Sequence, residues 1–279
     1  MSGPQIRPYA TAIGAEVLGV DLAQPLDNAG WATIHDAYLE HHVLFFPEQE
    51  LTPDEHVAFA RRFGELEDYP FVHGIEGHPE LIEIVKEPDE VINFGHRWHA
   101  DMTFREQPPA GAVLYALEVP PVGGDTLFAN MTLAWEMLSD GMKKTLRELR
   151  AIHDSGKPTR HSQNFKGMKM QHKEGSEQQI TAHPFVRIHP EAGQESLLIC
   201  PSYCHRIEGM TDEESTMILD HLERHATQDI FTCRYRWSPG DVVIWDNRCT
   251  MHIALEDDLA AIKGGQGFRR RMRRATIRS

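Results

Sequence analysis

The chain has 279 residues, of which 41% are hydrophobic and 25% are charged, the balance of a globular protein. Its formal net charge of −14 argues against nucleic acids and anionic membranes as partners, because both are bound by a positive field. No apolar run approaches the length of about 18 residues that indicates a transmembrane helix. We expect one domain over residues 1–279 and a cytoplasmic location, since the chain shows neither a secretory signal core nor a disulfide framework.

The N-terminal part predicts short strands and two helices. Loose alternation and a proline-ended apolar run predict strands over residues 13–22 and 42–47, with a helix between them over residues 29–40. A second helix is expected to begin at Thr52. Threonine caps it, Pro53 takes the first helical position, and Glu55 completes a capping box.

Strands dominate the rest of the chain. Alternating or continuous apolar runs predict strands over residues 81–85, 111–118, 126–129, 233–237, 242–245 and 270–277. Helices are expected over residues 133–138 and 142–152, and from Thr211, where Glu214 completes a second capping box. Many short strands with a few helices favour a mainly β sandwich or barrel over an alternating α/β fold.

Residues 155–179 stand apart because they are polar, contain glycine and have few branched apolar side chains. Such a segment can bury little surface. A loop this long inside a domain is typical of a mobile lid over an active site. A surface insertion without a function is the alternative.

The most informative short pattern is His99-Ala100-Asp101. In extended backbone, residues two apart point the same way, so this imidazole and carboxylate can converge on one metal ion. A second histidine from a distant strand would complete the arrangement of two histidines and one carboxylate that is typical of non-haem Fe(II) oxygenases. The chain has 17 histidines, so the triplet alone is weak evidence.

An arginine-rich strand near the C-terminus supplies a second signal. If residues 269–278 are extended, one face carries Arg270, Met272, Arg274 and Thr276. We expect this face to be interior and Arg269, Arg271 and Arg273 on the other face to meet solvent. Buried arginines need anions, which could be protein carboxylates or the carboxylates of a ligand.

Five patterns in order along the chain resemble the taurine dioxygenase and 2,4-dichlorophenoxyacetate dioxygenase (TauD/TfdA) family of Fe(II)- and 2-oxoglutarate-dependent oxygenases. They are Trp98-His99-x-Asp101, Pro108-Pro109-Ala110-Gly111, Gly123-Gly124-Asp125-Thr126-Leu127, Trp245-Asp246-Asn247-Arg248-x-x-x-His252 and Arg270-x-Met272-x-Arg274-Ala275-Thr276. The resemblance spans nearly the whole chain. It implies a double-stranded β-helix, the cupin-like jelly roll, with helices packed outside.

The resemblance also implies roles for single residues. His99, Asp101 and His252 match the Fe(II) ligands, and Thr126 and Arg270 match the pair that holds the distal carboxylate of 2-oxoglutarate. Arg274 matches a position that contacts the substrate sulfonate in the taurine enzyme and lies close to the cosubstrate in other members. O2 is the second cosubstrate, and succinate and CO2 are the products of 2-oxoglutarate.

The chain departs from the taurine enzyme where that enzyme carries a sulfonate-binding histidine. Residues 67–70 read Glu-Asp-Tyr-Pro here, and residues 93–96 read Asn-Phe-Gly-His. We therefore expect a small anionic substrate other than taurine, such as a carboxylate, a sulfonate or an aryloxyalkanoate. His73 and His96 are candidate replacements, although ordinary loop histidines are the simpler interpretation.

Two other functions use part of the same residues. A zinc hydrolase could employ two histidines and an aspartate, and a non-enzymatic cupin-like protein would share the barrel. Neither explains both an open metal site and a carboxylate anchor at Thr126 and Arg270. We expect His205, beside Cys204, to have no part in the site. A homo-oligomer is compatible with the sequence.

Overall fold

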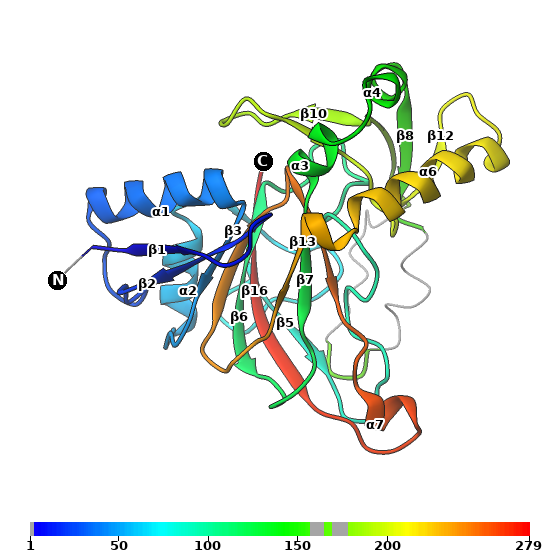
Figure 1. Cartoon of the computed structure of the whole chain (residues 1–279). Coiled ribbons are helices and arrows are strands. Elements are labelled where there is room, and N and C mark those ends of the chain that lie inside the picture. Colours follow the sequence, from blue (N-terminus) through cyan, green and yellow to red (C-terminus); the bar gives the residue numbers. More distant parts are fainter. Residues whose placement is uncertain (1–2, 157–164, 169–177) are drawn as a thin grey trace.

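A large sheet of eight strands forms the centre of the computed structural model, which describes residues 3–156, 165–168 and 178–279 (Figure 1). Seven strands follow the order β1-β2-β3-β14-β6-β16-β4, and β5 pairs with β16. All pairs are antiparallel except β2 with β3. The strands are β1 (Gln5–Pro8), β2 (Ala15–Leu18), β3 (Val43–Phe46), β4 (Leu66–Glu67), β5 (Leu81–Lys86), β6 (Gly111–Glu118), β14 (Val242–Asp246) and β16 (Arg270–Ile277).

Three smaller antiparallel sheets and a set of helices complete the described part of the chain. The order β13-β7-β15 consists of β13 (Thr232–Tyr235), β7 (Thr126–Asn130) and β15 (Thr250–Ala254). The order β12-β8-β9 consists of β12 (Cys204–Ile207), β8 (Arg150–Asp154) and β9 (Ile180–Pro184), and β10 (Val186–Ile188) pairs with β11 (Glu195–Leu197). The helices are α1 (Asn28–His41), α2 (Pro53–Ala60), α3 (Met131–Glu136), α4 (Asp140–Arg147), α6 (Asp212–Ala226), α7 (Leu259–Ile262) and a 3-10 turn, Asp229–Phe231.

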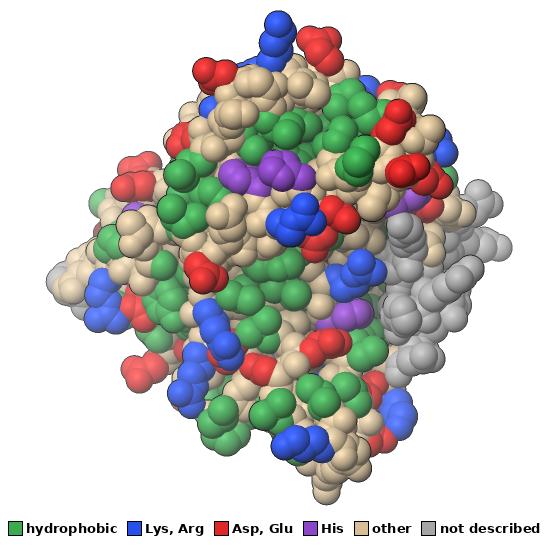
Figure 2. Space-filling view, turned by 45° about the vertical axis from the view of Figure 1, so that its right-hand side comes forward, with side chains coloured by type: hydrophobic (Ala, Val, Ile, Leu, Met, Phe, Trp, Pro, Cys, Tyr) green, Lys and Arg blue, Asp and Glu red, His purple; other side chains and the backbone are tan. Residues whose placement is uncertain are grey.

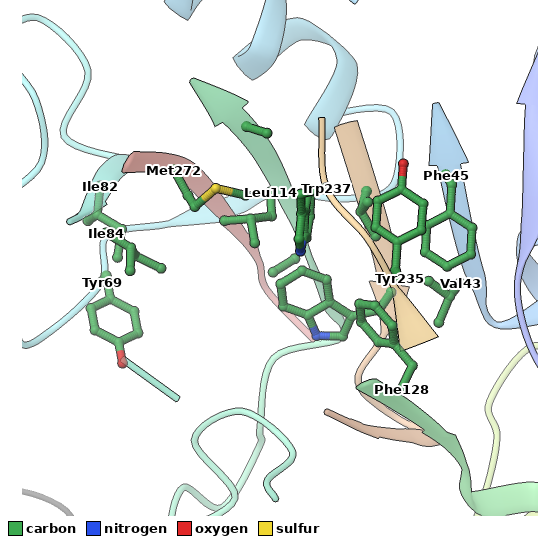
Figure 3. Close-up of a cluster of buried hydrophobic side chains, with 14 of the residues drawn as sticks. Val43, Phe45, Tyr69, Ile82, Ile84, Leu114, Phe128, Tyr235, Trp237 and Met272 are labelled. Atoms are coloured by element: carbon green, nitrogen blue, oxygen red, sulfur yellow. The ribbon is translucent and has the colours of Figure 1, made fainter. Parts of the chain in front are cut away.

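The large sheet is buried on both faces, which explains its continuous apolar runs. In β3, Val43 and Phe45 face one core while Leu44 and Phe46 face another, as the two-residue period of a strand requires. The first core lies between the large sheet and the sheet of β7, and Phe45 stacks there on Tyr235 with ring centroids 4.1 Å apart (Figure 3). Two antiparallel sheets thus enclose an apolar interior.

Helices α1 and α2 cover the outer face of the large sheet (Figure 1). Ile34 and Tyr38 of α1 and Val57 and Phe59 of α2 belong to the second core. A third core lies under α3 and α6. The mainly β class with added helices, predicted from the sequence, is confirmed.

Several local predictions are confirmed to the residue. Thr52 and Thr211 each cap a helix, and each accepts from the backbone N–H of the glutamate three residues later. The strand over residues 111–118 has the bounds that the sequence predicts. The helix expected over residues 29–40 is α1.

Two predicted elements are wrong in extent. The helix expected over residues 142–152 ends at Arg147, and residues 150–154 form β8 instead, because this segment pairs with both β9 and β12. The strand expected over residues 13–22 shortens to β2, since Gly14 and Gly19 on either side have φ of 90° and 74°.

The segment expected to form a lid, residues 155–179, lies largely outside the described residues. Its described residues are 155–156, 165–168 and 178–179, and among them Phe165 and Met168 contribute buried side chains to the first core. There Phe165 lies against Phe94, with ring centroids 5.8 Å apart. The role of a lid stays a prediction.

One face of the arginine strand was predicted wrongly. Arg269 and Arg271 are partly exposed and pair with glutamates, as expected for a solvent face. Arg273 is buried instead, and its Nη2 donates to the carbonyls of Leu51 and Thr52 at 2.8 and 3.0 Å. Helix α2 covers this part of the sheet, and a strand pattern alone cannot reveal such a cover.

The exterior mixes both signs of charge. On the described part of the face in Figure 2, Lys and Arg side chains are interspersed with Asp and Glu side chains. No helix in the described ranges is long and apolar enough to cross a membrane.

The contrast between Arg273 and Arg271 predicts their effects on stability. Arg273→Ala should lower the free energy of unfolding by about 2–4 kcal/mol, because two buried carbonyls lose a charged donor. Arg271→Ala should cost less than about 1 kcal/mol, because its partner Glu83 lies at the surface. Urea unfolding followed by circular dichroism measures both. Equal losses of unfolding free energy in the two variants would contradict the expectation that the buried bonds of Arg273 stabilise the protein more than the ion pair of Arg271.

Candidate active site

Two segments far apart in the sequence bring three ligand-type side chains together. His99 and Asp101 lie between β5 and β6, and His252 lies in β15. The backbones of His99 and His252 form an isolated antiparallel bridge, with N–H···O distances of 3.0 Å and 2.8 Å. This bridge sets the two imidazole rings side by side, with centroids 4.1 Å apart.

The three side chains form a compact and buried group. One potential ligand atom from each of His99, Asp101 and His252 lies within 4.8 Å of the other two. The Nε2 atom of His99 is 3.8 Å from Oδ1 of Asp101. The residues are 7%, 4% and 8% exposed, so the group is shielded from bulk water.

Neighbouring groups fix the orientation of His99 and Asp101. Nδ1 of His99 lies 2.7 Å from the carbonyl of Arg97, so this nitrogen carries the proton and Nε2 is free to bind a metal. Oδ2 of Asp101 accepts from Nε1 of Trp245 at 3.2 Å and pairs with Nη2 of Arg274 at 2.8 Å. The other carboxylate oxygen, Oδ1, faces His99.

The electrostatics favour the protonation states that a metal requires. Burial alone would raise the pKa of Asp101, but Arg274 and the two histidines lower it to about 2. Burial lowers the pKa of His99, and burial together with His99 lowers the pKa of His252 well below the usual range. The group therefore consists of one carboxylate and two neutral imidazoles at neutral pH.

This donor set fits a divalent transition metal. Two imidazole nitrogens and one carboxylate oxygen are the ligands of the facial arrangement found in non-haem Fe(II) oxygenases. Nδ1 of His252 is buried and has no hydrogen-bond partner among the described residues.

A cavity of about 450 Å³, counted out to its open mouth, joins this group to the two residues predicted to bind a carboxylate. Its wall includes His99, His252, Thr126 and Arg270, together with Arg274. The remaining lining is mostly apolar, including Ile84, Phe94, Leu114 and Phe128. Residues that the sequence places up to 190 positions apart thus share one cavity.

Arg270 is a buried cation without a compensating anion. It is 5% exposed, and its guanidinium makes no ion pair or hydrogen bond with the residues that the structure describes. Burial lowers its pKa to about 10, although Asp257 and Asp125 act in the opposite direction. Such a cation needs an anion in the cavity.

Trp237 connects Arg270 to Thr126. Its ring lies 5.7 Å from the Arg270 guanidinium, and its Nε1 donates to Oγ1 of Thr126 at 3.0 Å. Because Thr126 accepts this bond, its own O–H is free to donate to a ligand. From the sequence, Trp237 is expected only to end the strand over residues 233–237. A role in the site could not be predicted, because a tryptophan in a β-rich chain is usually a core residue.

Arg274 makes a contact that distinguishes it from Arg270. Its guanidinium lies between the rings of Tyr69 and Trp245, 5.5 Å from each centroid, and pairs with Asp101. The sequence left open whether a protein carboxylate or a ligand carboxylate would balance the buried arginines, and for Arg274 a buried protein carboxylate is present. Arg274 also lines the cavity, so the same side chain can meet a ligand.

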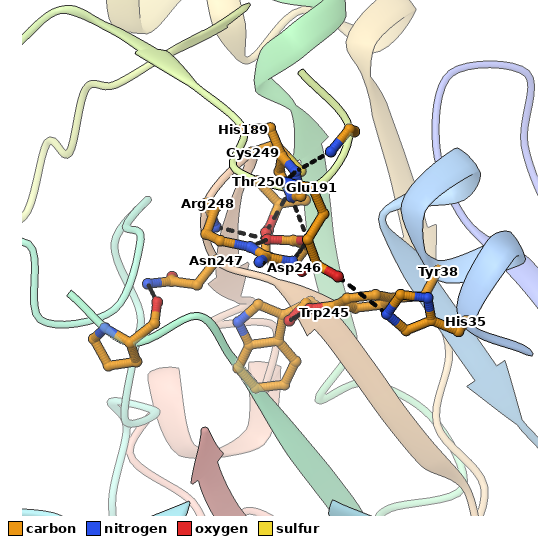
Figure 4. A network of polar contacts seen from close by, with 12 residues as sticks. His35, Tyr38, His189, Glu191, Trp245, Asp246, Asn247, Arg248, Cys249 and Thr250 are labelled. Carbon is orange, nitrogen blue, oxygen red and sulfur yellow. Dashed lines mark hydrogen bonds and ion pairs between the residues drawn. The ribbon is translucent and has the colours of Figure 1, made fainter. Parts of the chain in front are cut away.

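A second cluster, His189, Asp246 and Cys249, also has metal-type ligands close together. Hydrogen bonds already occupy it (Figure 4). His189 donates from Nε2 to Asp246 at 2.8 Å, Arg248 donates to both oxygens of Asp246, and burial raises the pKa of the Cys249 thiol. The protonated thiol and the saturated carboxylate make this cluster a support for the turn after β14.

The remaining histidines weighed from the sequence lie outside the ligand group. His205 lines a separate polar cavity with Arg97 and Glu223, and His73 lines another with Glu76 and Glu83. His96 acts on the pKa of His99 but is not part of the cavity wall described above.

Comparisons with known proteins settle the family. The profile described as "Taurine catabolism dioxygenase TauD, TfdA family" matches residues 5–276. The chain belongs to this family. It is a 2-oxoglutarate-dependent dioxygenase and hence an oxidoreductase, which confirms the resemblance seen in the sequence.

Individual relatives cover most of the chain. An alkylsulfatase of Acinetobacter baylyi is 35% identical over 91% of this chain and 80% of its own length. The (S)-phenoxypropionate/alpha-ketoglutarate-dioxygenase of Sphingobium herbicidovorans is 37% identical over 91% of this chain and 90% of its own. The crystal structure of a taurine dioxygenase from Burkholderia xenovorans superimposes with a TM-score of 0.82 at 36% identity, covering 100% of this chain and 92% of the other. The likeness confirms the jelly roll.

The triad geometry predicts how single substitutions change metal binding. Asp101→Ala should weaken Mn(II) binding by more than the roughly 10–100-fold that loss of an outer-shell partner costs, because it removes the only anionic ligand. His205→Ala removes an imidazole outside the group and should bind Mn(II) like the wild type. Titration followed by electron paramagnetic resonance of free Mn(II) gives both affinities. Wild-type binding by Asp101→Ala would refute the assignment.

Proposed function

We propose that this protein is an Fe(II)- and 2-oxoglutarate-dependent dioxygenase that hydroxylates a small anionic organic substrate. His99, Asp101 and His252 would hold Fe(II), which together with O2 and 2-oxoglutarate would supply the oxidising chemistry. The products of 2-oxoglutarate would be succinate and CO2. One observation carries the proposal. Arg270, a buried cation without an ion pair among the described residues, lines the same cavity as His99 and His252, whose neutral imidazoles lie beside the ionised carboxylate of Asp101.

Each residue of the cavity then has a physical role. The planar guanidinium of Arg270 can bind the distal carboxylate of 2-oxoglutarate through two parallel hydrogen bonds, and the free O–H of Thr126 adds a third. The apolar walls limit water, which strengthens these charged contacts. A zinc hydrolase or a non-enzymatic binding protein has no need of this anchor.

The substrate is proposed to be an anion with an apolar body. Arg274 supplies the positive charge near the metal ligands, and the cavity wall around it is largely apolar. The names of two relatives, the alkylsulfatase and the (S)-phenoxypropionate dioxygenase, refer to compounds with a sulfate group and with a carboxylate. Tyr69 occupies the segment where the taurine enzyme has a histidine, so taurine itself is a poor candidate.

The cytoplasmic location, the single domain over residues 1–279 and a homo-oligomeric state are part of the same proposal. They are the expectations drawn from the sequence, and the architecture described here is compatible with them.

The cosubstrate proposal predicts a difference between two adjacent arginines. The wild type should consume O2 and release succinate only with Fe(II) and 2-oxoglutarate present. Arg270→Ala should raise the 2-oxoglutarate requirement about tenfold to hundredfold, because a lost hydrogen bond to a charged group costs about 1.5–3 kcal/mol. Arg271→Ala, on the opposite face, should behave like the wild type. Equal effects of the two substitutions would refute the carboxylate anchor.

The substrate proposal predicts the outcome of a screen by O2 uptake. Carboxylates, sulfonates and sulfate esters with apolar bodies should be turned over better than their uncharged analogues. Arg274→Lys, which keeps a positive charge beside Asp101, should weaken binding of the best substrate, while 2-oxoglutarate binding to the Fe(II) enzyme, measured without substrate, stays close to the wild type. An uncharged best substrate would refute the anionic class, and weaker 2-oxoglutarate binding would assign Arg274 to the cosubstrate.

A further inference from the structure

The side chain of Asn247 is fully engaged with the segment that carries Asp101. Its Oδ1 accepts from the backbone N–H of Asp101 at 2.6 Å, and its Nδ2 donates to the carbonyls of Asp101 and Pro109 at 3.1 and 2.9 Å. The residue is only 2% exposed. These partners fix the orientation of the amide, because a flipped amide would place its donors against an N–H and its oxygen against two carbonyls.

These bonds hold a part of the backbone that would not otherwise stay in place. Met102, directly after Asp101, has a φ of 44°, a left-handed conformation that is costly for a residue other than glycine. The carbonyl that Asn247 binds belongs to the peptide between Asp101 and Met102. Asn247 therefore sets the orientation of this peptide and with it the direction of the Asp101 side chain.

Asn247 lies in the turn that connects β14 with β15, and these two strands carry two other parts of the site. Strand β14 provides Trp245, which donates to the Asp101 carboxylate, and β15 provides His252. The turn between them is held by Asp246, which accepts from His189 and Arg248 (Figure 4). Contacts of three kinds thus tie the segment from β14 to β15 to the segment of Asp101: the backbone bridge of His99 with His252, the bond from Trp245 to the Asp101 carboxylate, and the side chain of Asn247.

We propose that Asn247 is a positioning residue of the metal site, which sets the distance and direction of Asp101 relative to His252. It touches neither the metal ligand atoms nor the cavity, and it acts through the backbone of Asp101. The inference rests on the proposed function only in taking His99, Asp101 and His252 as the metal ligands.

Gln49 offers a matched control. It accepts from the N–H of Leu22 at 2.8 Å and donates to the carbonyls of Val20 and Pro47 at 3.2 and 2.9 Å. It is 7% exposed and lies between β3 and α2, away from the metal ligands. Asn247 and Gln49 therefore make the same three kinds of hydrogen bond, and only Asn247 makes them to a ligand segment.

The test compares Asn247→Ala with Gln49→Ala as metal-free proteins, at a temperature where circular dichroism shows both to be folded. Both should melt at lower temperature than the wild type. Asn247→Ala should bind Mn(II) about 10–100-fold more weakly, the usual cost of losing an outer-shell partner, while Gln49→Ala binds it like the wild type. Wild-type affinity in Asn247→Ala, or equal losses in the two variants, would overturn the inference.

A second variant covers the case in which Asn247→Ala does not fold. Asn247→Asp keeps the acceptor for the N–H of Asp101 but turns the amide donor into an oxygen that faces two carbonyls. Its added negative charge would by itself strengthen cation binding. Weaker Mn(II) binding therefore supports positioning, and equal or tighter binding overturns it.

The wild type and Asp101→Ala separate this inference from the proposed function. If Asp101→Ala binds Mn(II) as tightly as the wild type, the proposed metal site is refuted, and the inference about Asn247 is refuted with it. Mn(II) binding that is lost in Asp101→Ala but kept in Asn247→Ala would overturn the role of Asn247 alone.

Discussion

The site depends on one constraint, the buried negative charge of Asp101. A carboxylate that is 4% exposed must be compensated, because desolvation of an unpaired charge is prohibitive. Arg274 and Trp245 share Oδ2, and this division leaves Oδ1 toward His99. The strand β16, the consecutive strands β14 and β15 and the segment after β5 all meet at this carboxylate. The charge thus accounts for the convergence of three distant parts of the chain.

The arrangement of the strands allows these segments to converge. Strands β14 and β16 lie inside a sheet that is covered on both faces, so their two-residue period sends alternate side chains to opposite cores. In β16 this places Arg270 and Arg274 in the interior beside Met272, while Arg273 reaches the N-terminal end of α2. The three buried arginines of β16 differ in their partners. Arg273 donates to backbone carbonyls and Arg274 pairs with Asp101, whereas Arg270 has neither kind of partner among the described residues.

The sequence predicted the fold class, and it singled out the side chains that the structure brings together at His99, Asp101 and His252 and at Thr126 and Arg270, because these depend on local patterns and on the order of the motifs along the chain. Their roles as metal ligands and carboxylate anchor stay predictions. It could not predict contacts decided by tertiary packing. Residues 150–154 became a strand because two partners were available, and Arg273 became buried because α2 lies over it. The contact of the Asn247 amide with the backbone of Asp101 was not predicted, since nothing in the neighbouring sequence indicates it. The phase of a strand gives a direction for each side chain but not what covers it.

The two cavity arginines differ in what they offer a ligand. The charge of Arg274 is balanced by Asp101: burial lowers the pKa of this guanidinium, but Asp101 together with Tyr69 and Tyr203 raises it above its usual value. The charge of Arg270 is not balanced by an ion pair among the described residues, and burial lowers its pKa to about 10. An anion entering the cavity therefore gains most at Arg270. We therefore propose that a molecule with two anionic ends binds with one end at Arg270 and Thr126 and the other toward His99 and His252, and the imbalance of charge between the two arginines supports this orientation.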